Sequence, residues 1–206
     1  MLLLAPPARA DTDADVRAAF QRYVAAVAAR DGPAAVELVT PASLAQQERL
    51  RDLALGAPRA EVEALPMTDR LMVLRLRHEF TAAELRPLSG ADLLRIGVAE
   101  AWNSPKPLQV LTIADVEEGP DTAIASVTRA GDPVPLRLVF HTGPDGWRLD
   151  LVELARASDA ALAATLAFRA ERAKVDLDTA LRWALEDTSG HLVDKDLWLP
   201  LAGSQR

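Results

Sequence analysis

The stretch PVPLRLVFHTGPDGWRLDLVEL, residues 133–154, is the strongest indicator of the fold. Apolar and polar residues alternate on both sides of the turn sequence GPDG, which predicts two antiparallel strands joined by a hairpin. One face of this hairpin is wholly apolar, because alternate residues of a strand point the same way. The residues on that face are Leu136, Leu138, Phe140, Trp147, Leu149 and Leu151. We expect this face to pack against helices.

The opposite face of the hairpin is half polar. It carries Arg137, Val139 and His141 on the first strand and Arg148, Asp150 and Val152 on the second. Such a surface is typical of the solvent side of an antiparallel sheet. A paired His141 and Asp150 would suit general-base catalysis, but their outward direction favours a solvated histidine near a turn.

Two further strands precede this hairpin, at residues 108–116 and 122–128. The hairpin itself supplies strands at 135–140 and 147–154, and the turn sequences EEGPD, AGDP and TGPDG separate neighbouring strands. Residues 108–154 therefore predict a four-stranded antiparallel meander.

The residues before the sheet follow a helical period. A first helix from about residue 13 ends at Gly32, a second begins at Pro33, and a third is capped by Thr40 or Ser43. The apolar stripe of the first helix contains Val16, Ala19, Phe20, Tyr23, Val24 and Val27.

Further helices are indicated on both sides of the sheet. An apolar run of Leu71, Val73, Leu74 and Leu76 predicts a deeply buried segment. Thr81 with Glu84, and Ser89 with Asp92, have the spacing of capping boxes. The second box opens a helix that we expect to reach Trp102, and two more helices are expected at 158–173 and 176–187.

These patterns predict an α+β protein in which N-terminal helices pack on a curved antiparallel sheet, with a C-terminal helical extension. We divide the chain into residues 1–10, a domain over 11–155 and the extension over 156–206.

Composition excludes several classes of protein. The chain has 30 acidic and 23 basic residues, a formal charge of −7, which argues against a nucleic-acid partner. No apolar run approaches the roughly 20 residues of a membrane helix, so we expect no integral membrane segment. The absence of cysteine removes disulfides, thiolate zinc sites and a cysteine nucleophile.

The first residues, MLLLAPPARAD, predict export. Ala8-Arg9-Ala10 has the small-x-small spacing of a signal-peptide cleavage site, with Asp11 opening the mature chain. The apolar run is about four residues long, short of the usual 7 to 15, so we interpret residues 1–10 as the end of a truncated signal peptide. A Pro/Ala-rich tail is the alternative. The first interpretation places the protein in the periplasm or outside the cell.

The order of helices and strands resembles the nuclear transport factor 2-like superfamily. The resemblance covers residues 13–154 and is carried by VRAAFQRYVAAVAARDGPAAVELVTPASL and LRLVFHTGPDGWRLDLVEL. It implies a cone-shaped α+β domain with a pocket between the helices and the sheet. The pocket-lining residues would be Phe20, Tyr23, Val27, Trp102, Leu138, Phe140, Trp147 and Leu149.

The segment FQRYVAA is also similar to the first helix of ketosteroid isomerases, in which a tyrosine donates a hydrogen bond to the developing oxyanion. This similarity makes Tyr23 a weak catalytic candidate for a lyase or isomerase. Where those enzymes carry an acidic run, this chain has PASLAQQ, and the inward positions of its penultimate strand are Leu136 and Leu138. We therefore expect a non-catalytic binding or accessory module without cofactor or metal.

The residues after the sheet predict a contact with a partner. Trp183 lies off the apolar stripe of its helix, and Trp198 belongs to the tail LWLPL. Either the tail folds back over Trp183, or the two tryptophans form an interface with a protein partner or a second copy of the chain. The expected partners are thus a small apolar ligand or a protein, including a homodimer.

Overall fold

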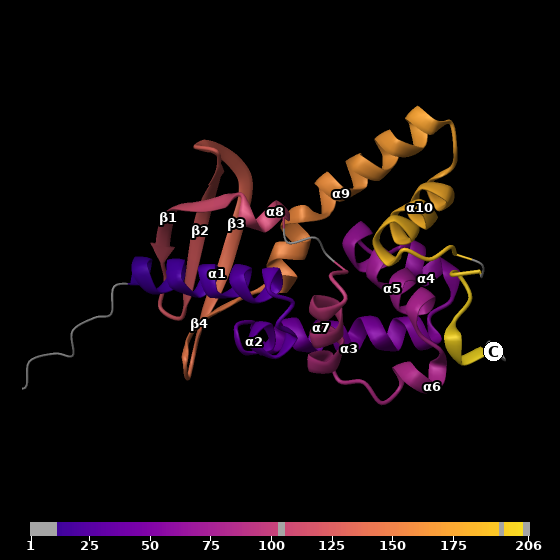
Figure 1. The fold of residues 1–206 in the computed structure, drawn as a ribbon, viewed down its shortest axis with the longest axis horizontal. Helices are drawn as coiled ribbons and strands as arrows, with labels where there is room; N and C mark the ends of the chain where they lie inside the picture. Colours follow the sequence, from indigo (N-terminus) through magenta and orange to yellow (C-terminus); the bar gives the residue numbers. More distant parts are fainter. Residues whose placement is uncertain (1–11, 103–105, 194–195, 204–206) are drawn as a thin grey trace, which may run out of the picture.

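The computed structural model of the chain describes residues 12–102, 106–193 and 196–203 (Figure 1). The proposed signal-peptide residues 1–10 lie outside the described residues. The protein is α+β, with an open four-stranded antiparallel sheet in the order β1-β2-β3-β4.

The helices before the sheet are α1 (Thr12–Ala28), α2 (Gly32–Glu37), α3 (Pro41–Gly56), α4 (Arg59–Glu63), α5 (Met67–Glu79), α6 (Ala82–Leu85), α7 (Gly90–Ala99) and α8 (Lys106–Gln109). The strands are β1 (Leu111–Glu118), β2 (Thr122–Arg129), β3 (Asp132–Gly143) and β4 (Gly146–Leu149). The chain continues through α9 (Leu151–Ala173), α10 (Leu177–Ser189) and the short helix η1 (Leu201–Gly203).

Several predicted helix starts are confirmed by their caps. The hydroxyl of Thr40 accepts a hydrogen bond from the backbone of Ser43 and caps α3. Both expected capping boxes form, Thr81 with Glu84 before α6 and Ser89 with Asp92 before α7. These caps satisfy backbone N–H groups that have no partner inside a helix.

The prediction of a strand at 147–154 is confirmed as far as Leu149 and is wrong for the residues after it. β4 ends at Leu149, and Leu151 to Leu154 form the first turn of α9. Asp150 causes the change, because its Oδ1 accepts hydrogen bonds from the backbone N–H of Val152 at 2.8 Å and of Glu153 at 3.2 Å. Leu151 therefore does not extend the apolar face of the strand.

The helix expected to reach Trp102 also stops early. α7 ends at Ala99, and Ala101 takes a left-handed conformation with φ of 51°. This turn folds Trp102 back onto α7, where a Cβ on Gly97 would lie 2.9 Å from its ring. Only glycine leaves room for the indole at that position.

The start of the first strand is also shifted. Leu108 and Gln109, expected in a strand, lie in α8, and β1 begins at Leu111. Pro107 lies within the first turn of α8, and a residue without a backbone N–H favours a helical first turn over a paired strand.

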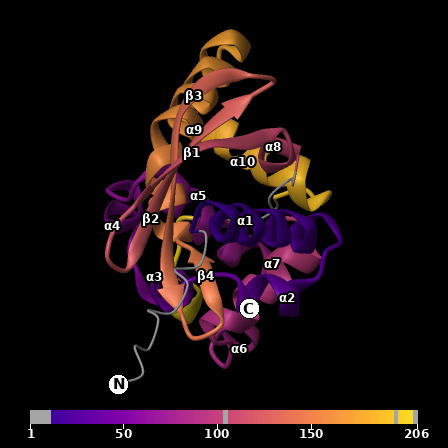
Figure 2. The ribbon, with the colours of Figure 1, turned by 90° about the vertical axis from the view of Figure 1, so that its left-hand side faces the viewer.

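The described residues form two hydrophobic cores. The sheet core joins α1, α2 and α7 to the apolar face of the sheet, as expected, and Figure 2 shows α1 on one side of the sheet with its axis across the strand direction. Its buried members are Val16, Ala19, Phe20, Tyr23, Ala26, Ala35, Val39, Val98, Leu111, Ile113, Ala123, Ala125, Val127, Leu138, Phe140 and Leu149.

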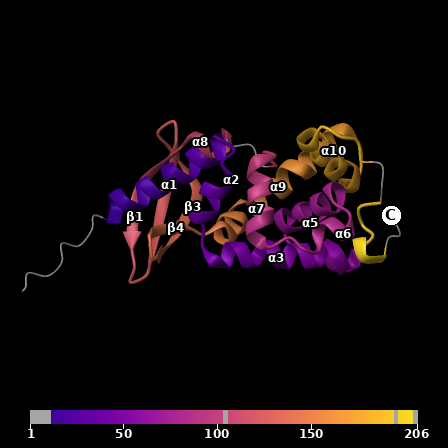
Figure 3. The same cartoon turned by 60° about the horizontal axis from the view of Figure 1, so that its bottom comes forward.

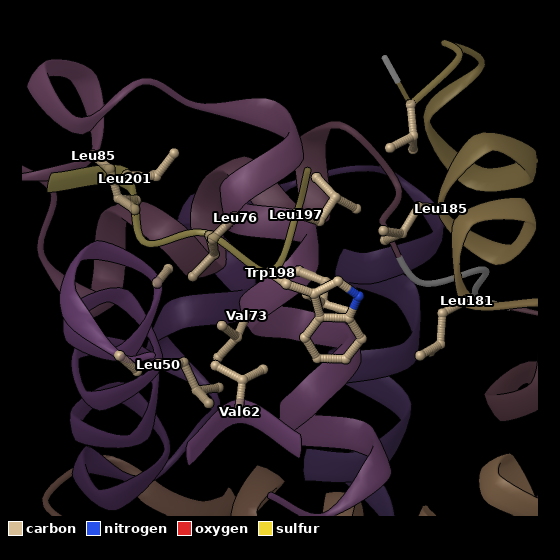
Figure 4. Close-up of a cluster of buried hydrophobic side chains, with 14 of the residues drawn as sticks. Leu50, Val62, Val73, Leu76, Leu85, Leu181, Leu185, Leu197, Trp198 and Leu201 are labelled. Atoms are coloured by element: carbon tan, nitrogen blue, oxygen red, sulfur yellow. The ribbon is translucent and has the colours of Figure 1, made fainter. Parts of the chain in front are cut away.

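The helical core lies beside it, among α3 to α7, α9, α10 and the C-terminal segment (Figures 3 and 4). Its buried members are Leu50, Ala54, Ala57, Val62, Met67, Val73, Leu74, Leu76, Leu85, Leu93, Trp102, Leu166, Leu181, Leu185, Val193, Leu197, Trp198 and Leu201. The predicted burial of Val73, Leu74 and Leu76 is confirmed.

The chain division expected at 155/156 falls inside a continuous helix. α9 runs from Leu151 to Ala173, contacts β3 near its start and packs on α5 and α10. Leu166 of α9, Leu181 of α10 and Trp198 of the tail all belong to the helical core, together with residues of α3 to α7. Residues from 156–193 and 196–203 thus share a core with residues from the first half of the chain.

Candidate functional site

The residues expected to line a pocket are divided between the two cores. Phe20, Tyr23, Leu138, Phe140 and Leu149 are buried in the sheet core, and Val27 and Trp147 pack against it. Trp102 belongs to the helical core instead. There its ring meets Phe80 edge-on, with centroids 6.1 Å apart.

Tyr23 sits deep in the sheet core with 6% of its surface exposed. Burial raises the pKa of its hydroxyl to about 12, and no charged group contributes to the shift among the described residues. An oxyanion donor of the isomerase kind works beside a carboxylate base in the same cavity. The pKa of Tyr23 reflects burial alone.

The two tryptophans of the predicted interface have different surroundings. Trp198 is buried in the helical core (Figure 4), and the guanidinium of Arg59 lies 4.6 Å from its ring centroid. Trp183 on α10 is partly exposed, and the guanidinium of Arg169 on α9 lies 5.6 Å from its ring centroid. A cation over each ring is a favourable arrangement.

A pocket of about 270 Å³ lies where the β3–β4 hairpin meets the start of α3. Polar residues from three parts of the chain line it: Thr40 before α3, His141 and Arg148 on paired strands, and Asp150 at the start of α9. Its remaining walls are Pro41, Ala42, Thr142, Gly143 and Pro144.

His141 and Asp150 form a pair in this pocket. The Nε2 atom of His141 lies 3.2 Å from Oδ2 of Asp150. The side chain of Asp150 is 10% exposed and that of His141 is 42% exposed. A buried carboxylate therefore orients a histidine ring that solvent and a ligand can reach.

Backbone hydrogen bonds around the pair fix the position of Asp150. The N–H of Asp150 donates to the carbonyl of Val139 at 2.8 Å, and its Oδ1 caps α9. Alongside, the segment before α3 pairs with β4, since the N–H of Thr40 donates to the carbonyl of Leu149 at 3.1 Å. The end of β4, the start of α3 and the start of α9 are thus held together.

The pairing of His141 with Asp150 was one of the two interpretations that the alternating pattern allowed. His141 lies on the outward face of β3, as expected, whereas Asp150 follows the end of β4 and is buried. The start of α3 completes a pocket beside the pair. Thr40 is more than 100 residues away from Asp150 in the chain, so no local pattern could have placed it there.

A second, wider hollow of about 540 Å³ runs along α3. Its charged lining residues are Glu48, Arg49, Asp52 and Glu61. Their mixed charges on an open helix surface are typical of a solvated face.

Two features are absent from the part of the chain that the structure describes. No three of its His, Asp or Glu side chains are grouped so that they could hold a metal ion. Among the helices that the structure describes, none combines the length and apolar character needed to cross a membrane. No family model, curated protein or solved structure with which the chain was compared matches it.

Proposed function

We propose that the protein is a non-catalytic binding or accessory module. The single observation that carries this proposal is the surroundings of Tyr23, the candidate oxyanion donor. Its hydroxyl is buried among apolar side chains of the sheet core, and no charged group alters its pKa among the described residues. Proton abstraction needs a base beside such a donor.

The resemblance to the nuclear transport factor 2-like superfamily fits this role, since that scaffold serves enzymes and binding modules alike. In support of it, helices precede an antiparallel meander, and α1 packs on the apolar face of the sheet. A cone-shaped sheet followed by a C-terminal helical extension is the finer form of the proposal. The module would bind a protein or a small apolar ligand, alone or as a homodimer.

The competing function is a lyase or isomerase that uses Tyr23. The test is an isomerisation assay with a β,γ-unsaturated ketone on the wild-type protein and on Tyr23→Phe. We expect no turnover above the buffer rate from either protein. Turnover by the wild type that Tyr23→Phe lowers at least about 100-fold would establish the enzyme, because loss of one oxyanion donor has roughly that effect.

A titration with a fluorescent fatty acid separates the two kinds of binding. Saturable binding at one site, weakened by Phe140→Trp in the sheet core, would support an apolar ligand. An absence of both turnover and saturable binding would favour a protein partner. Thermal unfolding of each variant verifies that it is folded.

We also propose that the protein is exported to the periplasm or secreted. The support is the Ala8-Arg9-Ala10 site before Asp11. Intact-mass measurement of the protein from its native host tests this, and we expect a mature chain that begins at Asp11. Recovery from the cytoplasm of a chain that retains Met1 would contradict export.

A further inference from the structure

We propose that the pocket between the β3–β4 hairpin and the start of α3 binds a small oxyanion, a carboxylate or phosphate group, through His141 and Arg148. This site is separate from the sheet core and does not involve Tyr23. The test of this site is therefore independent of the proposals about Tyr23 and the module's other contacts.

His141 is the first of the two ligand-binding groups. Its Nε2 lies 3.2 Å from the Oδ2 atom of Asp150, within ion-pair distance. The ring lines the pocket and its side chain is 42% exposed. A protonated ring therefore has an N–H group that it can donate to a ligand in the pocket.

Arg148 is the second binding group, and the sheet brings it to His141. The two residues are directly paired across β3 and β4, and side chains at such positions are close neighbours on one face. A Cβ at Gly143 would lie 3.0 Å from Nε of Arg148. The arginine therefore lies against the hairpin backbone that forms one wall of the pocket.

The carboxylates near His141 and Arg148 do not prevent the two side chains from binding an anion. Asp150 already accepts two backbone N–H groups of α9 through Oδ1, and its Oδ2 lies 3.2 Å from Nε2 of His141. Asp145 lies 3.6 Å from Arg148 but is 84% exposed, and such surface pairs are weak. On β2 the neighbouring residue Thr122 carries no charge, and Asp121 touches β3 through its backbone carbonyl.

The volume of the pocket limits the size of the ligand. About 270 Å³ lies just below the roughly 300 to 1,000 Å³ of sites for drug-sized molecules. The pocket suits a single carboxylate or phosphate group with a short substituent. A protonated histidine and an arginine are the usual donors for such groups.

The charged groups around the pocket come from three places. Arg148 on β4 is paired with His141, Asp150 lies at the start of α9, and Asp145 in the hairpin turn lies 3.6 Å from Arg148. The segment at the start of α3 contributes Thr40, Pro41 and Ala42 to the pocket, which carry no charge.

The experiment is an NMR titration of the full chain with sodium phosphate and, separately, with sodium acetate, followed through the histidine ring signals and the backbone amide signals. The sequence has three histidines, so His141 is assigned by comparing the wild type with His141→Gln. We expect saturation below about 10 mM of at least one anion. We also expect at least about tenfold weaker binding in His141→Gln and in Arg148→Gln.

Two matched variants control for general charge effects. Arg137→Gln removes an exposed arginine from the same strand, and His191→Gln removes an exposed histidine from a loop. Neither should change the affinity. Asp150→Asn keeps a cap for α9 but removes the carboxylate, and it should retain anion binding through His141 and Arg148 without unfolding the protein.

The outcomes of these titrations either identify the class of ligand or contradict the proposed site. Saturation by acetate alone indicates a carboxylate ligand, and saturation by phosphate alone indicates a phosphate ligand. No shift of the His141 signals with either anion would overturn the proposal. Equal affinity in Arg148→Gln, Arg137→Gln and the wild type, with each variant shown to be folded by thermal unfolding, would overturn it as well.

Discussion

The guanidinium of Arg77, in the last turn of α5, donates a hydrogen bond from Nη1 to the backbone carbonyl of Trp198 at 2.9 Å. Arg77 also donates to the carbonyls of Leu53, Ala54 and Ala57 at the end of α3 and of Leu197 in the tail. Burial lowers the pKa of Arg77 to about 10, still well above neutrality. A single charged side chain thus joins α3, α5 and the C-terminal segment.

Replacement of Arg77 should therefore destabilise the protein strongly. Arg77→Met keeps most of the side-chain volume but leaves buried carbonyls without donors, at about 1 to 3 kcal/mol for each such group. We expect a loss of at least about 3 kcal/mol in the free energy of unfolding, measured by chemical denaturation. Arg137→Met, on the exposed part of β3, should change it by less than about 0.5 kcal/mol. Similar stabilities for the two variants would contradict this role.

Two glycines in or next to α3 and α7 should respond oppositely to alanine. A Cβ on Gly90 would lie 2.0 Å from the carbonyl oxygen of Leu44, whereas a Cβ on Gly56 would meet nothing within 4 Å. Gly90→Ala should cost about 1 to 3 kcal/mol or more, because α3 and α7 would have to separate. Gly56→Ala should be neutral or stabilise the protein by up to about 1 kcal/mol. Thermal unfolding of both variants measures the difference, and equal melting temperatures would refute the close helix crossing.

Tyr23 should make stability fall at high pH. Burial raises its pKa to about 12, whereas an unfolded tyrosine ionises near about 10. The neutral hydroxyl therefore contributes stability that is complete below about pH 10 and is lost as the pH rises through about 12, roughly 3 kcal/mol in all.

The measurement is simple because Tyr23 is the one tyrosine of the chain. Its ultraviolet absorbance should report tyrosinate only near or above the pH at which the protein unfolds. Tyr23→Phe should remove this part of the alkaline destabilisation. A tyrosinate signal that appears near pH 10 in the folded protein would show that the hydroxyl is accessible.

The two C-terminal tryptophans should differ in their effect on stability. Trp198 is buried in the helical core beside Val62 and Val73 (Figure 4), so Trp198→Ala should cost about 3 to 5 kcal/mol. Trp183 is partly exposed, and Trp183→Ala should cost clearly less. Chemical denaturation of both variants decides this, and a larger loss for Trp183→Ala would mean that Trp198 does not hold the tail in place.

Much of the fold could be read from short-range patterns in the sequence. The alternation in residues 133–149 predicted which face of β3 and β4 is buried, and Leu138, Phe140 and Leu149 confirm it. The capping boxes at Thr81 and Ser89 were also predictable. These features depend on residues two to four positions apart, and the period of a strand or the geometry of a cap is local.

The end of β4 shows where a local pattern fails. The alternation continues through Asp150 to Leu154 and suits a strand, but Asp150 also has the chemistry of a helix cap. The start of α3 and the body of α9 then favour the helix, because the Ser43 hydroxyl accepts the N–H of Leu151 at 2.8 Å. That contact joins residues 108 positions apart.

The sequence by itself thus determined an α+β protein with an antiparallel meander, the apolar face of its hairpin, and the starts of several helices. Only the tertiary structure decided that Trp102 joins the helical core, that Arg77 binds the C-terminal segment, and that Thr40 and Arg148 meet the His141–Asp150 pair. The physical reason is distance along the chain. Periodicity and capping act within a few residues, whereas these contacts join segments that approach one another only when both cores are packed.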